Sequence, residues 1–90
     1  VVYGLSAALW GEITVDKGRV QQFNFDSYRV MRHNEVPAID ITLIESREKP
    51  GGIGEPATSL MAPALANAVF AATGKRVRRT PIRPETIAQA

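Results

Sequence analysis

The run from Ser59 to Thr73 constrains the fold of this chain more than any other segment. It is rich in alanine, a strong helix former, and carries no charged residue before Lys75. Gly74 is suited to end such a helix, and we expect Pro63 in its first turn, where no backbone donor is needed. Small apolar residues lie all round this helix, so it should be packed on nearly every side. A chain of 90 residues cannot provide that cover, and we therefore expect it to be part of a larger domain.

The N-terminal run from Val1 to Trp10 is apolar from its first residue. Its apolar residues follow the spacing of a buried helical face, and Gly11 is suited to stop it, which predicts a short buried helix within residues 3–12. The run is far shorter than the roughly 20 apolar residues of a membrane span. It also lacks the basic stretch of a signal peptide, so we expect neither. A start at Val1 without a solvated leader suggests a cut through a larger protein.

The central part of the chain carries strand signals. Residues 12–15 and 19–23 alternate between apolar and polar residues around Asp16-Lys17-Gly18, a pattern typical of a β-hairpin. Residues 24–36 are polar and predict a loop anchored by Tyr28, Val30 and Met31. Residues 39–45 alternate at their start, with β-branched residues on one side, and predict a half-buried strand. With a possible short helix at 84–89, these elements predict an α+β fold.

Composition and charge exclude several classes of site. There is no cysteine, so the chain can hold neither a disulfide, nor a thiolate metal site, nor an iron–sulfur cluster. The net charge of +2 comes from mixed charges along the chain and argues against a surface built to bind polyanions. One alternative remains open, in which a free-standing basic α+β module binds a partner or nucleic acid through residues 75–79. The other interpretation of this cluster is that its cations complement the dipole at the helix C-terminus.

Glu55 is the strongest candidate for a catalytic residue. It lies between Gly54 and Pro56, at the end of a glycine-rich loop and directly before the Ala-rich helix. A carboxylate flanked by apolar sequence loses solvation, and such carboxylates serve as general bases. Two other interpretations stay open at this point. Glu55 could act as a helix cap, and the glycines could form a phosphate cradle, although no Lys-Ser/Thr pair follows them.

Two further polar residues are weaker candidates. His33 is the only histidine, and without a second histidine or a cysteine it is more typical of a surface or loop residue than of a metal ligand. Tyr28 could donate a hydrogen bond into a site, but a tyrosine ring that anchors a polar loop is the commoner arrangement.

Three stretches together resemble a known family. The family is that of molybdenum hydroxylase large subunits, of the xanthine dehydrogenase and aldehyde oxidase type, and the likeness is greatest to the isoquinoline oxidoreductase beta-subunit branch. The stretches are Gly52-Ile53-Gly54-Glu55-Pro56 with Met61 to Arg76, Tyr3 to Leu9 with Gly11-Glu12-Ile13, and Asn24 to Tyr28 with Asn34 to Pro37. In this order they cover nearly the whole chain and are similar to the C-terminal part of the molybdopterin-binding domain, to which residues 1–90 would correspond.

The resemblance implies a function and a site. Glu55 would be the general base, the backbone of Gly52, Ile53 and Gly54 would line the cofactor, and no residue of this chain would bind the metal directly. The cofactor would be a molybdopterin, in bacteria usually the cytosine dinucleotide, with molybdenum. The reaction would hydroxylate an N-heteroaromatic ring or oxidise an aldehyde, with water as the oxygen source. One departure is Tyr3, where many relatives carry glutamine before the glycine, so a cofactor contact at Tyr3 is in doubt.

The same resemblance implies partners. The remainder of the molybdenum subunit would surround this piece, [2Fe-2S] clusters would lie on a separate small subunit, and the substrate would be a small molecule rather than nucleic acid. The location would be cytoplasmic or periplasmic, since relatives occur in both compartments.

Overall fold

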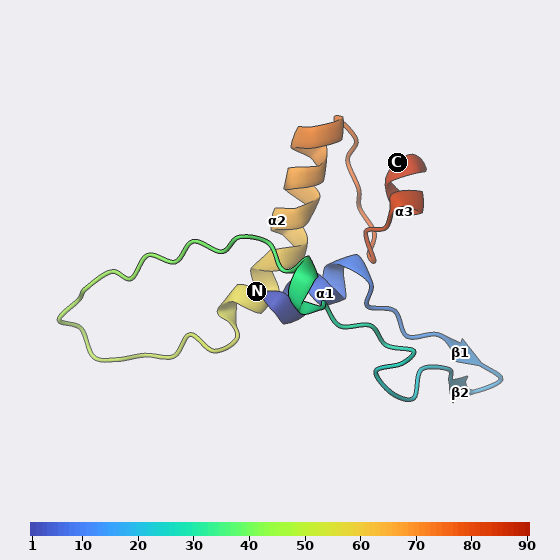
Figure 1. Ribbon diagram of the computed structural model, residues 1–90, viewed down its shortest axis with the longest axis horizontal. Helices are drawn as coiled ribbons and strands as arrows, with labels where there is room; N and C mark the ends of the chain where they lie inside the picture. Colours follow the sequence, from blue (N-terminus) through green and yellow to red (C-terminus); the bar gives the residue numbers. More distant parts are fainter.

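The computed structural model describes all 90 residues of the chain. In chain order its elements are α1 (Val2–Leu9), β1 (Val15–Asp16), β2 (Arg19–Val20), the short 3-10 helix η1 (His33–Glu35), α2 (Pro56–Thr73) and α3 (Pro84–Ala88). Figure 1 shows α1 near the centre, with α2 rising from it. The hairpin and the long segment between η1 and α2 extend to opposite sides.

The chain encloses very little interior of its own. Its radius of gyration is 16.2 Å and its extents are 54 × 34 × 25 Å, whereas a compact domain of this length has a radius of gyration of about 12 Å. Six of the 90 residues are buried. They are Gly4, Ser6 and Ala8 of α1 together with Met31, Val77 and Ile82. The small core therefore lies around α1.

Hydrogen bonds from α1 hold distant parts of the chain. The Ser6 hydroxyl donates to the Val2 carbonyl and accepts from the backbone N–H of Met31, both at 2.8 Å. The Ala8 carbonyl accepts from the backbone N–H of Ile82 at 2.7 Å. Carbonyls in the last turn of a helix have no partner inside it. The bond from Ile82 therefore satisfies the Ala8 carbonyl, which would otherwise need water.

The predicted N-terminal helix is present, and only Tyr3 and Ala7 of its residues are exposed. It ends at Leu9, before Gly11. The predicted loop at 24–36 is anchored at Met31, which is buried, and at Tyr28, which is partly buried.

The hairpin forms at the predicted place, with a tighter turn than expected. Val15 pairs with Val20 and Asp16 pairs with Arg19, so Asp16 belongs to the strand. The turn consists of Lys17 and Gly18, with φ of 50° and 77°. Positive φ at both central residues is the hallmark of a type I′ turn, whose twist matches that of the flanking strands.

Helix α2 begins earlier than predicted, and this corrects the placement of its internal proline. The helix starts at Pro56, so Pro63 lies in its interior rather than in its first turn. Pro56 takes the first helical position instead, where its fixed φ suits the helix and its missing N–H costs nothing. Gly74 ends the helix as predicted, with φ of 74°.

The surroundings of α2 differ from a fully packed helix. None of its residues is buried. A stripe of partly covered residues lies on one face, while residues on the other sides, such as Leu60 at 61% exposure and Phe70 at 42%, face solvent. The cover that this helix was predicted to need is therefore absent within the chain.

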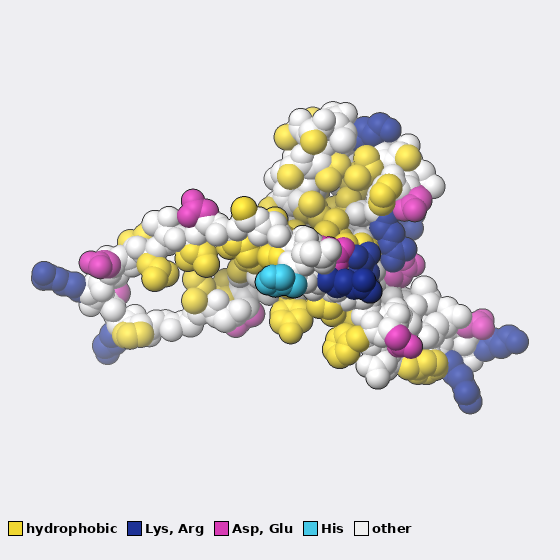
Figure 2. Space-filling model, viewed as in Figure 1, with side chains coloured by type: hydrophobic (Ala, Val, Ile, Leu, Met, Phe, Trp, Pro, Cys, Tyr) yellow, Lys and Arg dark blue, Asp and Glu magenta, His cyan; other side chains and the backbone are white.

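The strand predicted at residues 39–45 is wrong for this structure. The segment is extended but pairs with no other strand, because both faces and edges lack a neighbour within the chain. Its apolar residues are exposed, with Leu43 at 87% and Ile44 at 89%. Figure 2 shows apolar side chains at the surface along this segment and over α2.

We predict that the isolated chain has no cooperative unfolding transition. Six buried residues offer too little apolar burial to offset the conformational entropy of 90 residues. The helical circular dichroism signal should fall gradually on heating, and size-exclusion chromatography should show self-association. A sharp thermal transition of a monomer would contradict this prediction.

The turn before η1 is held by the carboxylate of Glu35. Its Oε1 accepts a hydrogen bond from the Arg32 backbone N–H at 2.9 Å, and its other oxygen forms an ion pair with Arg29. The hydrogen bond from Arg32 and the neighbouring Arg29 guanidinium lower the pKa of Glu35 below its ordinary value of 4.5. A lowered pKa means that the carboxylate stabilises the turn above the ordinary value and stops doing so as the pH falls through the lowered one.

This pH dependence is measurable at the Arg32 backbone amide. At neutral pH its hydrogen–deuterium exchange should be slower than in the matched variant Glu35→Gln, which keeps the shape but weakens the acceptor. The difference should vanish once the pH falls below the folded pKa of Glu35. Equal exchange of the two proteins at neutral pH would show that the carboxylate does not hold the turn.

Candidate functional site

Glu55 lies at the N-terminal boundary of α2 with its carboxylate free. It occupies the N-cap position, yet its side chain makes no capping hydrogen bond and no ion pair. Its backbone carbonyl accepts the N–H of Thr58 at 3.0 Å, which fixes the main chain. Its φ of −109° and ψ of −15° are helical, whereas a capping residue is usually extended. Glu55 therefore lies at the cap position of the helix, as the cap interpretation expects, but its carboxylate makes no capping hydrogen bond.

The glycine loop before Glu55 is open on every side. An added Cβ at Gly52 or Gly54 would meet no atom within 4 Å, and neither has a positive φ. Ile53 is 84% exposed. The only hydrogen bond within residues 37–54 joins the Glu48 N–H to the Ser46 hydroxyl, so the peptide groups of the loop are unpaired. Nothing inside the chain requires glycine here, and the loop is free to lie against an external group.

The burial that a general base needs is also absent from the chain itself. Glu55 is exposed, so the desolvation expected from its apolar neighbours in the sequence does not arise within these 90 residues. A second surface over the loop would have to exclude water from it.

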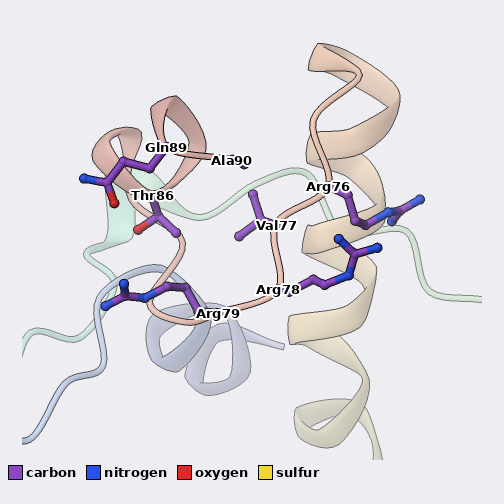
Figure 3. Close-up of a pocket in the computed structure, with 7 residues that line it drawn as sticks. All are labelled: Arg76, Val77, Arg78, Arg79, Thr86, Gln89 and Ala90. Carbon is purple, nitrogen blue, oxygen red and sulfur yellow. The ribbon is translucent and has the colours of Figure 1, made fainter.

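The side chains of the basic cluster at residues 75–79 lie in different environments. Val77 is 6% exposed and belongs to the core. Arg76 donates to the Asn67 side-chain oxygen at 2.9 Å and lies 3.9 Å from the centre of the Phe70 ring. An open hollow of about 350 Å³ beside this segment is lined mainly by the connection from α2 to α3 and by α3. Figure 3 shows Arg79 pointing away from Arg76 and Arg78, so the three guanidinium groups do not converge on one ligand.

Sequence reasoning missed a second cluster, around Trp10. The Arg29 guanidinium lies 3.9 Å from the centre of the Trp10 ring. Arg83 donates to the Trp10 carbonyl at 3.1 Å and forms an ion pair with Glu12 at 3.3 Å. These charges are widely separated along the chain, so no local pattern could reveal them. These side chains interact with one another and join α3 to the end of α1, so their role is structural.

The remaining candidates do not enter a site. His33 lies in η1 and is exposed, and the Tyr28 ring anchors its loop against Gly11, where an added Cβ would lie 3.2 Å from its hydroxyl. No group of histidine, cysteine or acidic residues is arranged to bind a metal ion. None of the helices is both long and apolar enough to cross a membrane. Glu55 and the residues before it are therefore the arrangement with the clearest chemical capacity.

Comparison with known proteins identifies relatives of nearly the whole chain. It is 37% identical over 96% of its length to the membrane-bound aldehyde dehydrogenase [pyrroloquinoline-quinone] of Gluconacetobacter polyoxogenes. It is 36% identical over 93% of its length to the isoquinoline 1-oxidoreductase subunit beta of Brevundimonas diminuta. It is 34% identical over 88% of its length to the aldehyde oxidoreductase molybdenum-binding subunit of Escherichia coli.

These matches cover only part of each relative. The chain spans 11% of the length of the first two proteins and 12% of the third. No protein-family model matches the chain, and no solved structure matches it significantly. The relatives are named as aldehyde and isoquinoline oxidoreductases, one of them as molybdenum-binding, in agreement with the resemblance seen in the sequence. The chain belongs, as one segment, to the family of molybdenum hydroxylase large subunits.

Proposed function

We propose that this chain provides the general base of a molybdenum-dependent oxidoreductase, and that the base is Glu55. The observation that carries the proposal is the free carboxylate of Glu55, which lies at the start of α2 without a capping bond or an ion pair. The similarity of nearly the whole chain to parts of an aldehyde dehydrogenase and of an isoquinoline oxidoreductase subunit supports the reaction class.

The glycine loop suits a large oxygen-rich cofactor. Residues 52–54 offer unpaired backbone N–H groups and no side chain that would bar close approach, apart from Ile53. Such groups can donate hydrogen bonds to an anionic or oxygen-rich ligand. The chain offers no set of side chains for the metal, so the pterin would carry the molybdenum. The residues present therefore fit a molybdopterin held mostly by other parts of the subunit, and we propose the cytosine dinucleotide form.

The overall reaction divides between the cofactor and Glu55. Water supplies an oxygen atom to a substrate carbon, the substrate loses two electrons, and two protons are released. When bound, the molybdenum cofactor supplies the two-electron acceptor and activates the water-derived nucleophile. The Glu55 carboxylate takes a proton from that nucleophile as it attacks an electron-poor carbon, which is general-base catalysis.

The names of the relatives guide the choice of substrate and partners. One relative is named for isoquinoline, an N-heteroaromatic ring, and two are named for aldehydes. We therefore propose both classes as substrates. Two of these names denote subunits, and we propose a small subunit with [2Fe-2S] clusters as the partner that removes the electrons. The Gluconacetobacter relative is named for pyrroloquinoline quinone, a different cofactor, so metal and quinone contents both need to be measured.

The first experiment is Glu55→Gln in the full-length subunit. Turnover of isoquinoline and acetaldehyde should fall by at least about two orders of magnitude, which is the usual cost of losing a positioned base. Molybdenum content and thermal stability should stay close to those of the unchanged protein, because the Glu55 side chain caps nothing. Persistent activity would exclude Glu55 as the base, and a protein with quinone but no molybdenum would refute the cofactor.

The glycine loop gives a separate prediction for cofactor binding. Gly54→Ala should lower the molybdenum content of the full-length subunit, since the added methyl group meets nothing in this chain and could clash only with the cofactor or its surroundings. Gly51→Ala is the matched control, because Gly51 has equal room and lies outside residues 52–54. Equal molybdenum contents in the two variants would show that the backbone at Gly54 does not approach the cofactor.

A further inference from the structure

The contact between α1 and α2 is unusually close at Gly4. A Cβ atom added to Gly4 would lie 2.6 Å from Cγ and 2.8 Å from Cβ of Met61, and 2.9 Å from the carbonyl oxygen of Thr58. Separations below 3.0 Å are essentially never seen for real Cβ atoms. The absence of a side chain at Gly4 therefore allows α1 to rest directly on the beginning of α2.

Thr58 joins this contact to Glu55. Its carbonyl oxygen faces Gly4, while its backbone N–H donates to the Glu55 carbonyl at 3.0 Å. A shift of the Thr58 peptide groups is thus passed to the main chain of Glu55 through one hydrogen bond. Pro56 lies between them with a fixed φ, which leaves little freedom to absorb the shift.

No hydrogen bond joins the first turn of α2 to another part of the chain. The loop before Glu55 makes no hydrogen bond to the rest of the chain, and its glycines have no neighbouring atoms. Among the helices, α2 packs only against α1. Figure 1 shows the N-terminal end of α1 beside the start of α2, with the loop extending away from both. Within these residues, the position of Glu55 depends on the approach at Gly4.

We propose that Gly4 is a positioning residue for Glu55, because its missing side chain sets the distance between α1 and the first turn of α2. This inference rests on the proposed role of Glu55 as the base. A methyl group at Gly4 pushes α2 away and displaces the carboxylate from the nucleophile. Displacements of about 1 Å can cost two orders of magnitude in rate, because proton transfer requires hydrogen-bond distance.

The test is Gly4→Ala in the full-length subunit, assayed with isoquinoline and acetaldehyde per bound molybdenum. The kcat value should fall by about 10- to 100-fold while KM stays nearly unchanged, since the base acts in the transition state and not in substrate binding. The matched control is Ala7→Ser, which adds one heavy atom to an exposed position of the same helix and should leave kcat unchanged. A wild-type kcat in Gly4→Ala would overturn the inference.

A double variant separates positioning from general damage. In the Glu55→Gln background, Gly4→Ala should cause no further loss of kcat, because the group that Gly4 positions is already gone. A further loss of the same size would mean that Gly4 acts through something else and would refute the inference. If Glu55→Gln alone is fully active, the proposed function fails; if it is inactive while Gly4→Ala is normal, only the positioning role fails.

The variant Gly4→Ala/Met61→Ala covers the case in which Gly4→Ala alone does not bind molybdenum. Removing Cγ of Met61 relieves the closest contact but leaves Cβ of residue 61 at 2.8 Å and the Thr58 carbonyl at 2.9 Å. Molybdenum content should recover while kcat stays low. Full recovery of kcat would show that the contacts which remain at the first turn of α2 do not position Glu55, and would overturn the inference. Failure of both variants to bind molybdenum, with Ala7→Ser loaded normally, would make Gly4 an assembly residue and would also overturn the inference.

Discussion

The packing of α1 against the first turn of α2 is the constraint on which the rest of this structure depends. No other two helices pack against each other, and the two strands of the hairpin pair only with one another. The other attachments also converge on α1, through the Ser6 hydroxyl, the Ala8 carbonyl and the Trp10 carbonyl. An eight-residue helix is marginal alone. It is stable here because other segments use its polar groups, so helix and attachments stabilise one another.

Sequence patterns predicted the parts of the fold that are fixed by nearby residues. The turn at Lys17 and Gly18 and the end of α2 at Gly74 follow from backbone conformations that glycine adopts easily. Gly4 and Ser6 gave no such signal, because both resemble the small residues that separate apolar positions in any buried helix. Their importance comes from partners at residues 31, 58 and 61, and that distance along the chain conceals it.

Two predictions failed, that of a strand at residues 39–45 and that of Pro63 in the first turn of its helix. Residues 39–45 have the alternation of a strand, but a strand needs a neighbour to hydrogen-bond with, and the chain supplies none. The lack of cover over α2, by contrast, agrees with the expectation that 90 residues cannot surround this helix. Pro63 was misplaced because two prolines, at 56 and 63, both suited the first turn, and the earlier one begins the helix. The catalytic role of Glu55 and the cofactor contacts at residues 52–54 stay predictions.

The backbone at the start of α2 explains why the Glu55 carboxylate is unpaired. With φ of −109° and ψ of −15°, Glu55 is already helical, whereas a residue whose side chain caps a helix is usually extended. Its side chain accordingly makes no capping hydrogen bond, and neither ion pair of the chain includes it. The proposed role of Glu55 rests on this unpaired carboxylate, because a side chain tied to the first turn of α2 could not also reach a bound group.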